Sequence, residues 1–302
     1  MNSWTPLVGA TLGWAAGSVL TRAVLVRGVS TWTLIPLRMS FALLTLAIVI
    51  LLTGRFLTTD PRAWRRGLSL GSVAMAFPMV LMTLAFEDLP VSLGGLLVAL
   101  IPLATIASAH FLVEGERFQA KTLPGLLLAL LGSALLVGVG GGAVEGVGNL
   151  WRGVILMLTG VLIAGIGGAL SRRFALQLSS DDLVLPQFTV NTVVVAGVLP
   201  IFVDFDIASV DGVSWWLIAG IGVLGTTLAF GSFLIAAGLN PASRLALVSY
   251  AIPVLSVALA VVFLGESLTP AIVGGAALIM TGVILAERST THVPEPGVAT
   301  AR

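Results

Sequence analysis

The charged residues of this chain lie so far apart that they leave long uncharged stretches between them. Ten stretches approach or exceed the roughly 20 apolar residues that a helix needs to cross a bilayer. One of them, 28–54, is interrupted only by Arg38, and another, 212–243, includes an exit turn. Ten such helices use about 200 positions of a 302-residue chain, so we expect no soluble domain. The other eight stretches are 1–21, 67–86, 89–113, 122–144, 153–171, 183–203, 245–265 and 267–286.

Composition narrows the class of protein further. Of all residues, 57% are hydrophobic and 10% are charged, whereas a soluble domain has about 25% charged residues. The net charge of +1 gives no reason to expect a nucleic-acid partner. Because the chain has no cysteine and two histidines, we expect no thiol catalysis, no metal site and no cofactor. The prediction is an all-α integral membrane protein with ten transmembrane helices.

Lysine and arginine indicate the orientation of the helices, because cytoplasmic loops are enriched in these residues. With the N-terminus in the cytoplasm, eleven of them lie on the inner side, and only Arg22, Arg27 and Arg152 lie on the outer side. We therefore expect a multi-pass protein of the inner (plasma) membrane with both termini cytoplasmic. The eleven inner residues are Arg55, Arg62, Arg65, Arg66, Arg117, Lys121, Arg172, Arg173, Arg244, Arg288 and Arg302.

The two halves of the chain resemble each other at a separation of about 150 residues. The offset is 151 up to an Ile-Pro pair and 150 from a following Gly-Glu pair onward. Each unit holds five helices, and an odd number makes the second unit enter the membrane from the opposite side. Two inverted repeats are therefore expected, an architecture of many secondary transporters. The matching residues are Pro90-Val91-Ser92, Ile101-Pro102, Gly115-Glu116, Gly125 and Gly132, against Pro241-Ala242-Ser243, Ile252-Pro253, Gly265-Glu266, Gly275 and Gly282.

This repeated pattern, together with Gly13-Trp14, Gly17-Ser18 and Arg38, resembles the drug/metabolite transporter superfamily. Within it, the chain is similar to proteins with two EamA-type five-helix repeats. The resemblance implies transport of small organic solutes, often outward and often amino acids or related metabolites. It implies neither one substrate nor an energy source. Glu114 departs from the pattern, because it adds an acid that has no counterpart in the second half.

The repeat also sets the expected domain organisation. We predict a first EamA-like five-helix repeat over residues 6–140, a second over 150–287, and a disordered cytoplasmic tail over 288–302. The expected partners are a small-molecule solute and the lipid bilayer. A homodimer is left open, and no nucleic acid is expected.

Two prolines occupy equivalent mid-span positions. Pro102 and Pro253 each remove a backbone donor and bend the helix, and the freed carbonyls must be buried in protein or face a watery cavity. We interpret them as symmetry-related helix kinks around the substrate path. The alternative is a static kink that aids packing.

One face of the first helix carries polar and aromatic residues. Thr11, Trp14, Ser18 and Arg22 are spaced i, i+3, i+7 and i+11, which places them on one side of a helix. Such a stripe is costly against lipid, so we expect Trp14, Ser18 and Arg22 to line a substrate cavity. Contacts between helices through small and hydroxyl residues are the alternative.

Arg38 and Arg22 are the candidates for charge inside the membrane. If the second helix begins near Thr33, Arg38 lies about one turn deep, and its side chain can extend to the outer interface. The alternative is a counter-charge for an anionic or carboxylate-bearing solute. The residues alone leave both open.

Several polar residues remain within spans. Tyr250 is the only tyrosine and its hydroxyl needs a partner, which a kink carbonyl or a solute can supply. We place Tyr250 and Thr226 among the cavity candidates, while Gln187 and Asn191, at i and i+4, are expected either in helix packing or at the cavity. The paired glycines of the fifth and tenth helices are explained by close helix packing.

The function expected from these features is secondary transport of small organic metabolites by alternating access. Amino acids or related compounds, moved outward, are the first expectation, and sugar-phosphate-like or drug-like solutes are the alternative. A membrane enzyme is disfavoured, because no nucleophile–base pair and no H-E-x-x-H pair are present. A non-transporting scaffold or sensor is a further alternative and predicts no central cavity.

Overall fold

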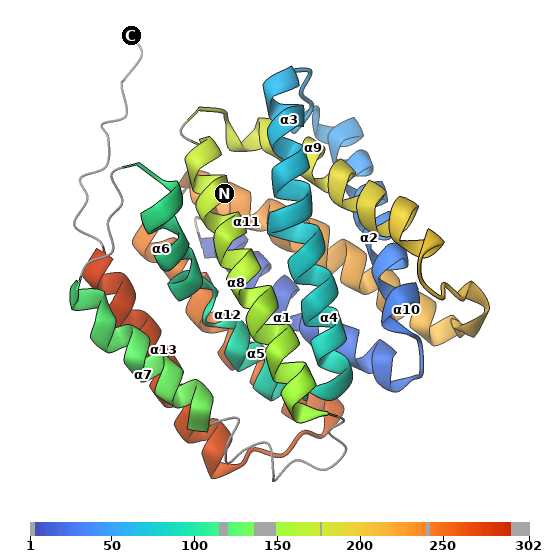
Figure 1. Cartoon of the computed structure of the whole chain (residues 1–302). Coiled ribbons are helices and arrows are strands. Elements are labelled where there is room, and N and C mark those ends of the chain that lie inside the picture. The colour runs from blue at the N-terminus through green and yellow to red at the C-terminus, as the bar shows by residue number, and fades with distance from the viewer. Residues whose placement is uncertain (1–3, 115–119, 136–148, 176, 240–241, 291–302) are drawn as a thin grey trace.

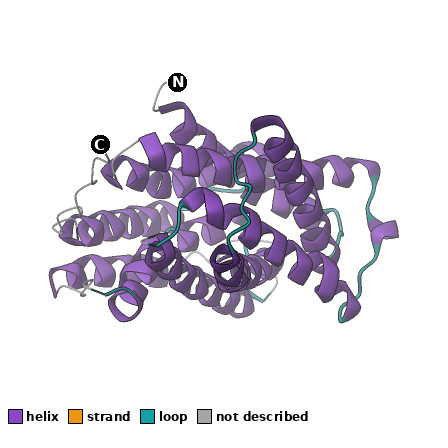
Figure 2. Ribbon diagram, turned by 90° about the horizontal axis from the view of Figure 1, so that it is seen from above, coloured by secondary structure: helices purple, strands orange, loops and turns teal. Residues whose placement is uncertain are grey.

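The structure is built from helices that cross the bilayer. The computed structural model describes residues 4–114, 120–135, 149–175, 177–239 and 242–290, and every regular element in these ranges is helical (Figures 1 and 2). Seven segments are long and apolar enough to cross a membrane, and three shorter apolar helices make ten. Helices suit this environment because they satisfy their own backbone hydrogen bonds. The prediction of an all-α, ten-helix membrane protein is confirmed.

The first half of the chain holds five membrane spans. The third span is a continuous helix made of three segments, and the fourth is interrupted near its middle. The elements are α1 (Trp4–Val26), α2 (Thr31–Thr53), α3 (Pro61–Ser69), η1 (Leu70–Ala76), α4 (Phe77–Asp88), α5 (Val91–Val98), α6 (Ile101–Leu112), η2 (Ala120–Thr122) and α7 (Leu123–Leu135).

The second half repeats this arrangement. Its last helix ends at Thr290, so residues 288–290, which were assigned to the tail, belong to a helix; residues 291–302 and the Gly115-Glu116 pair lie outside the described residues. The elements are α8 (Leu150–Ala175), α9 (Ser180–Thr192), η4 (Val193–Val198), η5 (Leu199–Ile201), η6 (Ile207–Ser209), α10 (Gly212–Gly222), η7 (Val223–Leu228), α11 (Ala229–Leu239), α12 (Ala242–Leu264) and α13 (Pro270–Thr290).

Local sequence fixes several helix ends. The side chain of Ser30 accepts a hydrogen bond from the backbone N–H of Thr33 and begins α2, as serine commonly does at an N-cap. At the other end, Gly54 takes a left-handed conformation with φ 66° and donates to the carbonyl of Ile50 at 2.8 Å. Glycine adopts this conformation without the cost that a side chain would add.

Two wide π-helical turns occupy equivalent positions in the two halves. η1 lies in the third span and η7 in the eighth, and the repeat offset of 151 carries 70–76 onto 221–227. A further π-helical segment, η4, lies in the seventh span. Such turns interrupt the i→i−4 ladder and are frequent at functional sites. The local backbone therefore follows the repeat that the sequence predicts.

Eight of the spans pack into a closed ring. The third span, α3–η1–α4, contacts α9, and α9 contacts α2. From α2 the ring continues through α10–η7–α11, α1, α12 and α5–α6, each in contact with the next. The ring closes at α8, which contacts both α6 and α4. The remaining pair, α7 and α13, packs side by side at one edge of the molecule (Figure 1). α4 also contacts α1 and α2 across the ring. Contacts therefore join the two halves throughout.

Glycines set the closest approach between helices. A Cβ added at Gly125 would lie 2.5 Å from the carbonyl oxygen of Gly282, and one at Gly132 would lie 2.9 Å from that of Gly275. The packing explanation for these glycines is confirmed. α1 approaches η7 in the same way, because a Cβ on Gly17 would lie 3.1 Å from the Cα of Gly225. Small residues allow such contacts between membrane helices.

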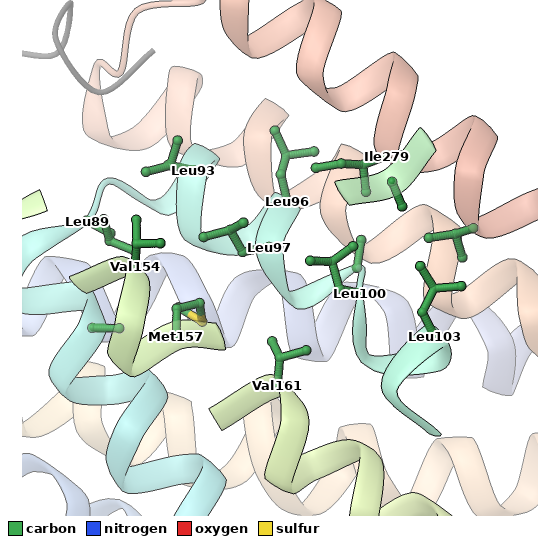
Figure 3. Packing of buried hydrophobic residues seen from close by; sticks show 14 of the residues in the cluster. Leu89, Leu93, Leu96, Leu97, Leu100, Leu103, Val154, Met157, Val161 and Ile279 are labelled. Carbon is green, nitrogen blue, oxygen red and sulfur yellow. The ribbon is translucent and has the colours of Figure 1, made fainter. Parts of the chain in front are cut away.

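The largest buried apolar cluster lies around α5, where Leu93, Leu96 and Leu97 meet Met157 of α8 and Ile279 of α13 (Figure 3). Every residue from Val91 to Leu97 is buried. The cluster joins α5 and α6 to α7, α8 and α13. The bundle is therefore tightly packed around α5.

Candidate functional site

Trp14 lies inside the bundle. Its ring centroid is 5.4 Å from that of Phe233 on α11, and it packs against a small apolar cluster that joins α1, α11 and α12. Ser18, one turn further along, donates to the carbonyl of Trp14 at 3.3 Å, a bond within its own helix. Both side chains remain partly exposed. In contrast, Leu12, on the opposite face of α1, is 48% exposed, as suits a lipid-facing residue.

Arg22 has another role than Trp14 and Ser18. Its Nη1 donates to the carbonyl oxygens of Phe86 at 2.6 Å and Glu87 at 3.1 Å, in the last turn of α4. These carbonyls lack donors within the helix and carry partial negative charge. Arg22 therefore joins the C-terminal ends of α1 and α4, and the structure does not place it in one cavity with the other two residues.

Arg38 reaches across to the eighth span. Its Nε donates to the hydroxyl of Thr226 at 3.0 Å, and Thr226 donates in turn to the carbonyl of Ile221 at 3.0 Å. That carbonyl lies at the end of α10, five residues before Thr226, so the junction of α10 with the π-helical turn η7 supplies an acceptor for the buried hydroxyl. Arg38 is partly buried, and within the described residues it forms no ion pair. An arginine without an acidic neighbour is costly inside a membrane.

Asn191 and Gln187 lie on α9, which packs against α2 and against η1. Asn191 is fully buried and donates weakly to the sulfur of Met39 at 3.5 Å. Its carbonyl oxygen has no hydrogen-bond partner in the part of the chain that the structure describes. Gln187 is 5% exposed, and its backbone carbonyl lies against Gly71 of η1. Both residues therefore lie at helix–helix contacts, and Asn191 contacts the residue that follows Arg38.

Pro102 lies in the fourth span, and Tyr250 and Pro253 lie in the ninth. Tyr250 packs against the large apolar cluster around α5. Pro102 follows a break at Ala99 and Leu100 and lies in the first turn of α6, whereas Pro253 lies inside an uninterrupted α12. The two prolines therefore differ in local structure, although the sequence pattern predicts matching kinks. The break in the first half separates α5 from α6.

A cavity of about 150 Å³ lies between α2, α9, η7 and α11. Its lining is mostly apolar and includes Phe188 and Phe230. The polar lining residues are Thr53, Arg55, Thr227 and Ser232. Thr227 is adjacent to Thr226 in the sequence, so the cavity lies beside the residue that binds Arg38. None of the residues predicted to line a substrate cavity is among its lining residues; these are Trp14, Ser18, Arg22, Arg38, Thr226 and Tyr250.

The structure thus joins some of the candidates and separates others. It brings Arg38 and Thr226 into contact, and it leaves Trp14 and Tyr250 in separate apolar clusters. Sequence reasoning missed the contribution of Glu266, whose carboxylate binds the start of α5. The Gly-Glu pattern itself was the available signal, because it places an acid at the same point in each repeat.

Comparison with known proteins agrees with the repeated architecture. The model of the EamA-like transporter family matches the chain twice, over residues 6–138 and 151–288. No curated protein matches. One crystal structure of a protein is similar, with 21% sequence identity and a TM-score of 0.69 over 98% of this chain and 99% of that one. At this identity the similarity concerns the fold alone.

Proposed function

Because the chain belongs to the EamA-like transporter family, we propose that it moves small carboxylate-bearing metabolites, amino acids or related compounds, outward across the inner membrane. The family makes it a membrane transporter of the drug/metabolite type. The substrate class, the direction and the mechanism are the parts that we propose.

The single observation that carries the substrate class is the position of Arg38. Its charge lies within a membrane span, and its hydrogen-bond partner Thr226 is a neutral hydroxyl. Charges inside a membrane usually pair with each other or mark a solute pathway. A solute carboxylate would supply the missing negative charge, and the planar guanidinium suits a bidentate contact with it.

The size of the neighbouring cavity favours a small solute. Its volume of about 150 Å³ is below the roughly 300–1,000 Å³ of sites that hold drug-sized ligands. A phosphate-bearing solute is also less favoured, because Arg22, the second arginine considered for that role, already binds the carbonyls at the end of α4.

The inverted repeats favour alternating access as the mechanism. In such proteins one group of helices rocks against the other around a site near the bilayer midplane. The excess of arginine and lysine on one side supports an orientation with both termini in the cytoplasm.

Counterflow in reconstituted vesicles tests this proposal. Vesicles loaded with an unlabelled amino acid should take up the labelled compound, whereas the matching amine without its carboxylate should not exchange. Arg38→Lys should retain much of this exchange because the charge remains, and Arg38→Leu should lose at least about tenfold, the value of one charge-assisted bond.

Thr226→Val is the matched control, because it removes the neutral partner and keeps the charge of Arg38. It should weaken exchange less than Arg38→Leu does. Loss of folded protein in both Arg38 variants would assign Arg38 a purely structural role. Absence of counterflow for every solute tested, with folded protein in the vesicles, would instead favour a scaffold or sensor.

A further inference from the structure

The outer end of α4 is held by two arginines from two different helices. Arg22 of α1 donates to the carbonyl oxygens of Phe86 and Glu87. Arg152 of α8 pairs with the carboxylates of Glu87 at 2.9 Å and Asp88 at 3.3 Å. These contacts hold α4 across the outer end of the ring, above the buried cluster around α5. In the orientation proposed above, these contacts and those of α4 with α2 close the outer side.

The repeat gives Arg22 a counterpart at the other side of the membrane. The offset of 151 that relates the first four spans of the two halves carries Arg22 onto Arg173, and it also carries Gly9 onto Gly160 and Gly17 onto Gly168. Arg22 lies in the last turns of α1, and Arg173 lies in the last turn of α8. Because the second repeat is inverted, Arg173 lies at the inner end of its helix.

The binding partner of Arg22 has a counterpart as well. The same offset carries the end of α4 at Asp88 onto Leu239, the last residue of α11. The carbonyls of Phe86 and Glu87 correspond to those of Ala237 and Gly238. Ala237 and Gly238 therefore hold, in the second repeat, the places of the two residues whose carbonyls bind Arg22 in the first.

The two arginines differ in what they contact here. Arg173 is exposed, and the described residues include no partner for its guanidinium. Arg22 is partly buried and makes two hydrogen bonds. The neighbouring Arg172, whose counterpart is Thr21 rather than an arginine, does not share this relationship.

We propose that Arg22 and Arg173 are alternate latches of transport. Arg22 closes the outer side by binding the end of α4, as in this structure, and Arg173 closes the inner side in the opposite state by binding the carbonyls at the end of α11. The two repeats exchange conformations during the cycle, so one latch forms as the other breaks. Removing a latch destabilises only the state in which it is formed, and the population shifts to the other state.

This inference rests on the alternating access proposed above, and its test needs no solute. In the cysteine-free chain, Ser92→Cys places one thiol in the outer half of the bundle, where Ser92 is 1% exposed. A membrane-impermeant thiol reagent added to intact cells should label it slowly. Adding Arg22→Gln should raise the labelling rate about tenfold, the population change expected from one charge-assisted hydrogen bond.

The inner latch predicts the opposite result. Arg173→Gln should lower the labelling rate of the Ser92→Cys thiol, and the double variant Arg22→Gln/Arg173→Gln should return it toward that of the reporter alone. Arg172→Gln is the matched control and should leave the rate unchanged. A rate that rises in both single variants, does not change in Arg22→Gln, or falls equally in Arg172→Gln would overturn the proposal.

A second reporter separates latch release from general loosening of the fold. Ile279→Cys on α13 places a smaller side chain at a fully buried position in the contact with α7, away from both latches. Its labelling should stay slow in every variant, and labelling of this thiol in Arg22→Gln would count against the latch. If the protein catalyses counterflow but the labelling rate is the same in all variants, the proposal of the two latches is rejected and the proposal of transport stands.

Discussion

The carboxylate of Glu266, which lies just before α13, accepts a 2.7 Å hydrogen bond from the backbone N–H of Val91 at the start of α5. It accepts a second one, at 2.9 Å, from the N–H of Ser92. A helix N-terminus has unsatisfied donors and partial positive charge, so a carboxylate is a favourable partner. The acid of the second repeat thus caps a helix of the first.

Neutralising this acid should destabilise the protein. Glu266→Gln removes the charge and one of the two acceptors, and we expect a loss of about 1–3 kcal/mol, measured as a lower Tm in detergent. Asp204→Asn is the control, because Asp204 is exposed and makes no hydrogen bond in the described structure. Equal Tm changes in the two variants would show that the loss of any one negative charge lowers the Tm, and that the hydrogen bonds of Glu266 to the start of α5 are not the cause.

The inverted topology predicts opposite positions for two reporter fusions. A reporter fused after Gly140 should be periplasmic, because five spans precede it, and one fused after Arg288 should be cytoplasmic, because ten do. Enzymatic reporters that are active on only one side of the membrane measure this directly. The same readout at both positions would contradict the ten-span topology.

Single cysteines should distinguish the interior face of α1 from its lipid face. Trp14→Cys, Ser18→Cys and Tyr250→Cys should react with a small water-soluble thiol reagent if these positions face a hydrated path, because the reactive thiolate needs water. Transported solute should protect them.

Leu12→Cys and Val19→Cys are the matched controls on the same helix. Leu12 is exposed on the opposite face, where lipid would suppress the thiolate, and Val19 is 6% exposed against neighbouring helices. Both should react slowly. Similar labelling at all five positions would indicate a loosely packed bundle and would contradict the prediction that Trp14, Ser18 and Tyr250 face a hydrated path.

The contact between α7 and α13 should tolerate no side chain at its closest point. A Cβ at Gly282 would lie 2.5 Å from the backbone nitrogen of Ala129 and from the carbonyl oxygen of Gly125. Gly282→Ala should therefore cost about 1–3 kcal/mol through overpacking, measured as a lower Tm. Gly274→Ala on the same helix is the control, because the nearest atom would lie at 3.6 Å; a drop in its Tm equal to that of Gly282→Ala would contradict the explanation.

Asp211 should make stability depend on pH in acid. Hydrogen bonds from the Arg27 side chain and from Ser214 hold the pKa of this carboxyl well below its ordinary value of 3.8. A lowered pKa stabilises the folded state above the ordinary value, and the contribution disappears as the pH falls through the lowered one. The Tm of wild type should exceed that of Asp211→Asn by a constant small amount from pH 7 to 5, and the difference should shrink below pH 3.8. A difference that grows in acid would refute this assignment.

The sequence predicts the number of helices and their repetition, because both follow from local properties. The spacing of charged residues predicts where the spans lie, and the recurring glycines predict close backbone contacts such as that of Gly125 with Gly282. The partner of Arg22 and the π-helical turn beside Thr226 were not predictable in this way. Both depend on which helices meet, and a polar side chain on a helix face gives no information about its partner across the bundle.

The glycine contacts between α7 and α13 have a geometric consequence. Gly125 meets Gly282, and Gly132 meets Gly275, whereas the repeat relates Gly125 to Gly275 and Gly132 to Gly282. Each contact is therefore carried onto the other when the two halves are interchanged. The twofold axis that relates the two repeats passes between α7 and α13, so the contacts between these helices stay the same when the two repeats exchange conformations. The pair α7 and α13 can therefore serve as a fixed reference for measuring how far every other helix moves.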